Sequence, residues 1–119
     1  MAKKYYKGFN EDLTCRGFQY EEGKTYEEPT AKLCGSGFHA CEDPLDCFSY
    51  YSPSSSQFRE VLLEGVVDKH KGDPEDDTKV CARKITVGAR LSLSQMIRAS
   101  FDFRWSRAVL EPGASATGD

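Results

Sequence analysis

The chain has 119 residues, of which 39% are hydrophobic and 29% charged, and its formal net charge is −3. These values fit a single folded domain with one core, and they exclude a long disordered chain. The acidic balance disfavours non-specific nucleic-acid binding, and no apolar run approaches the roughly 20 residues that a membrane span needs. Residues 1–4 do not open a secretory leader and the five cysteines should stay reduced, so we expect a cytoplasmic protein.

Short strands are expected in the first quarter of the chain. Residues 3–9 are rich in aromatic side chains, which favours a strand, and Gly8 marks a bend or a close backbone approach within it. Residues 17–20 predict a second strand. Glu21-Glu22-Gly23 then reverses the chain, and residues 24–26 are predicted to return as the partner strand of a hairpin.

The stretch Cys34-Gly-Ser-Gly-Phe-His-Ala-Cys41 joins a glycine turn to a short strand, which we place at residues 38–41. A helix is predicted directly after it, because Asp43 is a good N-cap and Pro44 suits the first helical position. This helix is expected to end before Ser52. Two thiols and one of the two histidines of the chain lie within these eight residues, so this stretch is the first candidate for a functional site.

Two longer strands follow. Residues 58–67 carry apolar side chains on both faces, which favours a central position in a sheet. The segment 68–77 is predicted to be an exposed charged loop, and residues 79–87 form the next expected strand. Neighbouring residues on a strand point to opposite faces, so its basic residues are assigned to the surface rather than to an anion site. These residues are Lys79, Arg83, Lys84 and, beyond the strand, Arg90.

Ser92 and Gln95 match a capping box, in which the two side chains satisfy the first backbone amides of a helix. We predict that this helix ends near Ser100. The aromatic residues at 101, 103 and 105 alternate with polar ones, which indicates a strand, and a longer helix is the alternative.

The pattern as a whole predicts a small α+β domain with a mostly antiparallel sheet and two helices. The globular domain is expected to span residues 1–111. Residues 112–119 contain glycine and small side chains that cannot form a core, so we expect a flexible tail there.

Zinc is the first chemistry considered for the central segment, because Cys34, His39 and Cys41, with Cys15 or Cys47, would supply four ligands. Their spacing differs from the regular cysteine pairs of structural zinc sites, so we expect no metal. A Cys41 nucleophile with His39 as its base is the alternative chemistry. Side chains two residues apart on a strand lie parallel rather than in line, which disfavours this arrangement.

Tyrosines are numerous for a domain of this size. A tyrosine ring buries apolar area while its hydroxyl keeps a polar tip, so tyrosines often line ligand clefts and protein interfaces. We expect more than half of them to serve packing and the others to face a cleft. They are Tyr5, Tyr6, Tyr20, Tyr26, Tyr50 and Tyr51.

Short motifs of glycine, aromatic residues and cysteine occur along nearly the whole chain. They are Tyr6-Lys-Gly-Phe9, Cys15-Arg-Gly-Phe-Gln-Tyr20, Gly23-Lys-Thr-Tyr26, Leu33-Cys34, Gly37-Phe-His-Ala-Cys-Glu42 and Pro44-Leu45-Asp46. Together they resemble an uncharacterised domain of phage and prophage proteins, which is often followed by short repeats of the Gly-Ala-Ala-Ser-Ala-Thr-Gly type. The chain ends with the similar sequence Gly113-Ala-Ser-Ala-Thr-Gly-Asp119. This resemblance implies a bacterial or phage setting, and it implies no particular activity.

The order of the expected elements carries a second, remote resemblance. A first strand with a glycine, the strand at 38–41, a helix ending in Tyr50-Tyr51 and two further strands follow an order similar to the small ADP-ribosyltransferases, particularly the rifampin-modifying type. That resemblance implies a transferase-like fold around NAD, with a histidine on the first strand and a tyrosine on a later one. Here these positions fall at Lys7 and His39, which implies an altered NAD site.

Three functions are therefore considered. The first is a phage-encoded binding protein, without a cofactor, that inhibits or redirects a bacterial host protein or complex such as a defence nuclease. The second is an NAD-dependent ADP-ribosyltransferase, and the third is a structural head domain that caps a repeat stalk. The residues expected to bind a ligand or a partner are Lys7 and His39, with Tyr50 and Tyr51 on the wall of the same groove.

Overall fold

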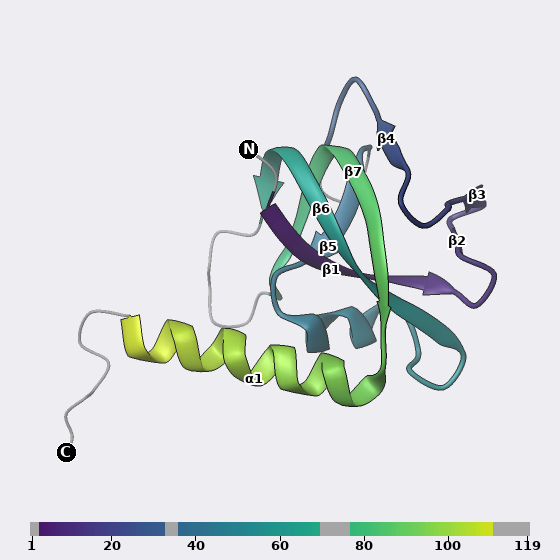
Figure 1. Cartoon of the computed structure of the whole chain (residues 1–119). Coiled ribbons are helices and arrows are strands. Elements are labelled where there is room, and N and C mark those ends of the chain that lie inside the picture. The colour runs from purple at the N-terminus through teal and green to yellow at the C-terminus, as the bar shows by residue number, and fades with distance from the viewer. Residues whose placement is uncertain (1–2, 33–35, 70–76, 111–119) are drawn as a thin grey trace, which may run out of the picture.

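The computed structural model describes residues 3–32, 36–69 and 77–110. Strands predominate in it, with a short helix in the middle of the chain and a long helix after the last strand (Figure 1). This arrangement confirms the predicted α+β class with a mostly antiparallel sheet. The strands are β1 (Lys3–Asn10), β2 (Thr14–Cys15), β3 (Phe18–Gln19), β4 (Thr25–Glu27), β5 (Phe38–Cys41), β6 (Ser56–Lys69) and β7 (Lys79–Leu91), and the helices are the 3-10 helix η1 (Pro44–Ser49) and α1 (Leu93–Leu110).

The main sheet closes on itself. Its strand order is β4-β7-β5-β1-β6, and an additional pairing joins β6 back to β7. Every one of these pairings is antiparallel, and the contact between β1 and β5 is a single pair, Tyr6 with Cys41. The strands β1, β6, β7 and β5 therefore form a small ring, and β4 extends the edge of β7 that β5 also uses.

The core fills the inside of this ring because alternate residues of each strand point inward. Tyr5 and Phe9 of β1 are buried, and so are Val61 and Leu63 of β6. The prediction that β6 is central is confirmed, since it pairs with β1 on one side and β7 on the other. Its second apolar face is not buried, however, because 43% of Leu62 is exposed.

The predicted hairpin between residues 17–20 and 24–26 is wrong. β3 pairs with β2 instead, through the two-residue turn Arg16-Gly17, and β4 pairs with β7. The short β4 is held by a distant strand rather than by its neighbour in sequence, for example through the pair Tyr26 and Ile85. The turn residues at 21–23 correctly predict where the chain reverses, but they do not predict which strand β4 pairs with.

The helix predicted after β5 is present as η1. Asp43 caps it, since its Oδ1 atom accepts a hydrogen bond from the Leu45 amide at 3.1 Å, and Pro44 occupies the first turn as expected. The same carboxylate accepts hydrogen bonds from Ser100 and Arg104 of α1 at 2.5 and 2.6 Å. Asp43 therefore joins the two helices and also caps the first.

The capping box at the start of α1 is confirmed. The Ser92 amide donates to Gln95 Oε1 at 2.7 Å, and the Gln95 amide donates to Ser92 Oγ at 3.1 Å. The predicted end near Ser100 and the strand after it are wrong, because α1 continues to Leu110. No glycine or proline interrupts residues 93–110, so no helix-breaking residue ends the helix before Leu110.

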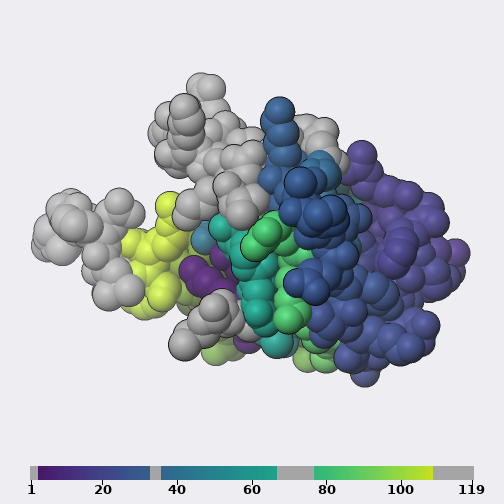
Figure 2. Space-filling view, turned by 90° about the horizontal axis from the view of Figure 1, so that it is seen from above, coloured from purple at the N-terminus to yellow at the C-terminus, as the bar shows by residue number. Residues whose placement is uncertain are grey.

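The molecule is elongated, with principal extents of 49 × 30 × 25 Å. Seen from above, the N-terminal strands lie at one end in purple and blue, and the yellow end of α1 projects at the opposite end (Figure 2). Neither described helix is long and apolar enough to cross a membrane. The predicted loop at 68–77 falls mostly, and the predicted tail at 112–119 entirely, outside the described residues.

Candidate ligand cavity

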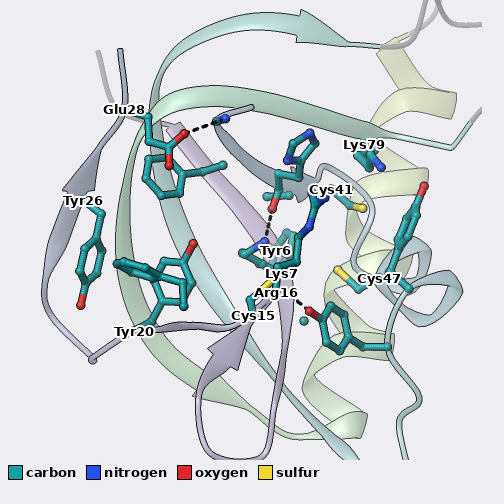
Figure 3. A pocket seen from close by; sticks show the side chains of 18 of the residues that line it. Tyr6, Lys7, Cys15, Arg16, Tyr20, Tyr26, Glu28, Cys41, Cys47 and Lys79 are labelled. Carbon is teal, nitrogen blue, oxygen red and sulfur yellow. Dashed lines mark hydrogen bonds between the residues drawn. The ribbon is translucent and has the colours of Figure 1, made fainter. Parts of the chain in front are cut away.

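A cavity of about 590 Å³ opens beside β1 and β5, and all of the residues expected at the site line it. Lys7 comes from β1 and His39 from β5, while Tyr50 and Tyr51 follow η1. The four residues therefore line one cavity although they lie far apart in the chain. Figure 3 shows its two sides, with Tyr20 and Tyr26 on one, Lys79 and Cys47 on the other, and Lys7 and Arg16 between them.

Lys7 is an inward-facing residue of β1, on the same face as Tyr5 and Phe9, and only 8% of it is exposed. Its Nζ atom donates a hydrogen bond to the backbone carbonyl of His39 at 2.7 Å and lies 5.6 Å from the centre of the Phe9 ring. Among the residues that the structure describes, no carboxylate pairs with it. A buried cation without a counter-charge is costly, so an anion in the cavity would stabilise it.

Two more cations line the same cavity. Arg16 occupies the turn between β2 and β3 with a φ of 54°, and Lys79 begins β7 with its Nζ atom 4.5 Å from the centre of the Tyr50 ring. Among the side chains that the structure describes, neither of these two forms an ion pair. This side of the cavity therefore carries three cations, although the whole chain carries a net charge of −3.

His39 lies within this positive field. Its Nε2 atom is 3.3 Å from the Lys32 carbonyl oxygen, and the ring is half-buried. Burial lowers the pKa of the imidazole, and the charges of Lys7, Lys79 and Arg16 lower this pKa further. His39 is therefore neutral at pH 7, and a bound anion would raise its pKa by offsetting the neighbouring charges.

The opposite side of the cavity is aromatic. The rings of Phe18, Tyr20 and Tyr26 contact one another edge to face, with centroid separations of 4.7 to 5.3 Å. Burial raises the pKa of the Tyr20 phenol well above its usual range, so its hydroxyl stays uncharged. Glu27 and Glu28 also line the cavity, and the Glu28 carboxylate accepts a hydrogen bond from the Gly37 amide at 3.0 Å. The lining of the cavity thus combines these rings and two carboxylates with the three cations of the other side.

Three thiols lie in the cavity wall, and one of them is Cys41, the nucleophile considered and disfavoured from the sequence. The hydrogen bond between Cys41 and Cys47, together with burial, raises the pKa of the Cys41 thiol far above its usual range. Cys41 is therefore a neutral thiol rather than a thiolate. Cys15 accepts a hydrogen bond from the Tyr51 hydroxyl at 2.9 Å, which fixes that ring against the wall.

The candidate metal ligands do not converge in the part of the chain that is described. Within it, no group of three or more histidine, cysteine or acidic residues is close enough to hold a metal ion. Cys34, one of the candidate ligands, lies outside the described residues.

Sequence reasoning missed several cavity residues. Lys79 was assigned to the surface, whereas it lines the cavity, because the start of β7 pairs directly with β5. Arg16 was not singled out, although an arginine before a glycine at a tight turn is an unusual choice where asparagine is preferred. Phe18 was missed because its strand has only two residues and gives no periodic signal.

Comparisons with known proteins identify a family without an assigned activity. Residues 3–99 match a family described as a domain of unknown function (DUF7666), and the chain belongs to this family because the match covers most of its length. No curated protein and no solved structure gives a significant match. The chemistry of the cavity is therefore the main guide to function.

Proposed function

We propose that this DUF7666 domain is a binding protein whose cavity holds a ligand with an anionic group and a flat ring, the chemistry of a nucleotide. The observation that carries the proposal is the buried Lys7, which faces the cavity without a carboxylate partner among the described residues. Arg16 and Lys79 extend the same positive wall. Lysine and arginine side chains are the usual protein partners of phosphate groups.

The shape of the cavity supports a small ligand rather than a flat protein surface. Its volume of about 590 Å³ falls within the range of roughly 300–1,000 Å³ that is typical of ligand sites. The aromatic side, with Phe18, Tyr20 and Tyr26, offers surfaces against which a base can pack. A neutral His39 and the tyrosine hydroxyls supply the polar groups that orient a ring.

The sequence resemblance to phage domains suggests where such binding would act. We propose that the protein works in the bacterial host cell, where it inhibits or redirects a host protein or complex, such as a defence nuclease. Capture of a nucleotide that the host system uses, or of one bound to it, would be the inhibitory step. The proposal requires binding alone, which agrees with the neutral thiol of Cys41 in the cavity.

NAD-dependent ADP-ribosyl transfer is the second candidate, because the same arrangement favours it. Lys7 and His39 lie on the paired strands β1 and β5 and line one cavity, as the remote resemblance implied. The positive wall suits a pyrophosphate. However, transferases carry a histidine and a tyrosine where this chain has a lysine and a histidine, so the reacting end of the site fits NAD poorly.

The test is a titration of isotope-labelled protein with ADP, followed by nuclear magnetic resonance, with adenosine as the uncharged comparison. ADP should shift the signals of His39 and of the cavity backbone, and adenosine should bind at least about tenfold more weakly because it lacks the phosphates. Equal binding of the two ligands, or shifts confined to residues outside the cavity, would contradict the proposal.

Matched variants locate the site. Lys79→Met removes a cation from the wall and should weaken ADP binding by about tenfold. Lys4→Met removes an exposed lysine that pairs with Glu60 outside the cavity, and it should leave binding unchanged. Release of nicotinamide from NAD would favour the transferase instead. A cavity that binds neither ADP nor NAD would favour a structural head domain.

A further inference from the structure

The exposed face of α1 carries a row of large apolar side chains. Leu93, Ile97, Phe101 and Trp105 follow one another at intervals of four residues, and each is between 52% and 62% exposed. We call these four residues the α1 ridge. The side of α1 that packs on the domain is defined by Met96 and Ser100, which are buried. The helix therefore presents a second apolar surface that nothing in the described chain covers.

We propose that the α1 ridge is the contact surface of a homodimer, in which α1 of one copy crosses α1 of a second copy in an antiparallel direction. Side chains spaced four residues apart form the ridges that interlock when two helices cross at about −50°. In a two-fold symmetric contact, residue i of one copy meets residue j of the other, and the reverse contact also forms. The ridge is suited to this arrangement.

The sizes of the side chains favour the antiparallel pairing. The first half of the ridge is aliphatic, with Leu93 and Ile97, and the second half is aromatic, with Phe101 and Trp105, whose rings stack at 6.3 Å. Antiparallel crossing places Ile97 against Phe101 of the other copy and Leu93 against Trp105. Each contact therefore joins one aliphatic side chain and one ring, whereas parallel pairing would set ring against ring at one end and leave a gap at the other.

The charged residues beside the α1 ridge also favour a second copy of this chain as its partner. Arg98 and Asp102 lie beside the ridge, 3.5 Å apart and exposed, so the edge carries no net charge that would repel a second copy. Antiparallel crossing sets the arginine of each copy near the aspartate of the other. The C-terminal segment 113–118 of this chain contains only Gly, Ala, Ser and Thr, so it has no large side chain to cover the ridge.

The contact should be weak and dependent on concentration. Two rings and two aliphatic side chains that are each about half exposed offer on the order of 400 Å² per copy, below the roughly 800 Å² per partner of a typical stable interface. The oligomeric state should therefore be measured by sedimentation equilibrium over a wide concentration range. The emission of Trp105, the one tryptophan in the chain, reports burial of the ridge at the same time.

Two single substitutions and their mixture test both the contact and its direction. Ile97→Glu and Phe101→Lys each place an unpaired charge in two symmetric contacts, so each variant alone should be a monomer. Mixed together, they should associate again, because antiparallel crossing sets the glutamate of one variant against the lysine of the other. Ser106→Glu changes an exposed residue of α1 away from the ridge and should self-associate as the unchanged chain does.

Each result decides the proposal. Concentration-dependent dimers of the unchanged chain, monomers of both single variants and recovery in the mixture support it. An unchanged chain that stays monomeric up to millimolar concentration, or dimers that persist in both single variants, would overturn it. A mixture that stays monomeric would overturn the antiparallel pairing. Circular dichroism of each variant checks that α1 is intact, as expected for exposed positions.

Discussion

Two residues show how the cavity departs from what stability alone would favour. Lys7 occupies an inward position of β1 that alternation with Tyr5 and Phe9 would assign to an apolar side chain. Arg16 adopts a left-handed backbone conformation, with a φ of 54°, at a turn position where asparagine is preferred. Buried charges and strained backbone conformations of this kind are concentrated at functional sites. The three cations that line the cavity support the same assignment.

Arg16→Asn should therefore change stability and binding in opposite directions. Asparagine tolerates the left-handed conformation of a two-residue turn, so the free energy of unfolding should rise by about 1 kcal/mol. Loss of the guanidinium should weaken ADP binding. Urea denaturation and the ADP titration measure the two effects. Arg90→Asn, which removes an arginine that pairs with Glu11, serves as the control and should not improve stability. A less stable Arg16→Asn protein would show that the turn needs arginine for folding.

His39 predicts a pH dependence. Its pKa in the folded protein lies below the usual value of about 6.5 because of burial and neighbouring cations, so the unfolded chain binds a proton more readily. The stabilising contribution of the neutral ring is fully present above about pH 6.5 and is lost as the pH falls through the folded pKa. His39→Asn should flatten this part of the profile of melting temperature against pH. If His39 titrated at or above its usual pKa in the ligand-free protein, the neighbouring cations would not lower its pKa, and this prediction would be wrong.

At the scale of elements, the two predicted helix caps, which depend on neighbouring residues, are confirmed, and the predicted partner of β4, whose true partner lies far away in the sequence, is wrong. Asp43 and the box of Ser92 and Gln95 were correct because each cap is formed within three residues. The partner of β4 was wrong because it lies about 60 residues away on β7. The continuation of α1 was missed because residues 101 and 105 fit a strand and also a helix, and only packing around Met96 and Ser100 shows which face is buried.

Asp43→Ala tests the junction of the helices. From the cap alone the expected loss is about 1 kcal/mol, but the carboxylate also binds Ser100 and Arg104, so we expect a loss of about 3 kcal/mol in the free energy of unfolding. Ser92→Ala removes a cap without this junction and should cost about 1 kcal/mol. Equal losses for the two variants in urea denaturation would show that the contacts of Asp43 with α1 contribute little.

At the scale of the whole molecule, closure of the sheet brings the cavity residues together. Lys7 and Lys79 face one space because β5 pairs with both β1 and β7. Closure depends on the long ribbon of β6 and β7, whose register shifts twice, once near residue 60 and once near residue 67. Such bulges bend and twist a ribbon. The sequence predicted both strands and not the ring, because nothing in the alternation of apolar residues reveals which edges meet.

Gly88 lies at the first of these bulges, so Gly88→Ala tests whether closure of the ring depends on it. A Cβ atom at this position would lie 2.7 Å from the backbone oxygen of Glu60, which cannot move without disturbing the ribbon. We therefore expect a loss of about 1–3 kcal/mol in the free energy of unfolding, together with faster amide exchange in both β6 and β7. Ala89→Ser, at the neighbouring exposed position, should have little effect in either measurement. If Gly88→Ala lowered protection only next to residue 88, the ribbon would tolerate the change locally, and closure of the ring would not depend on this bulge.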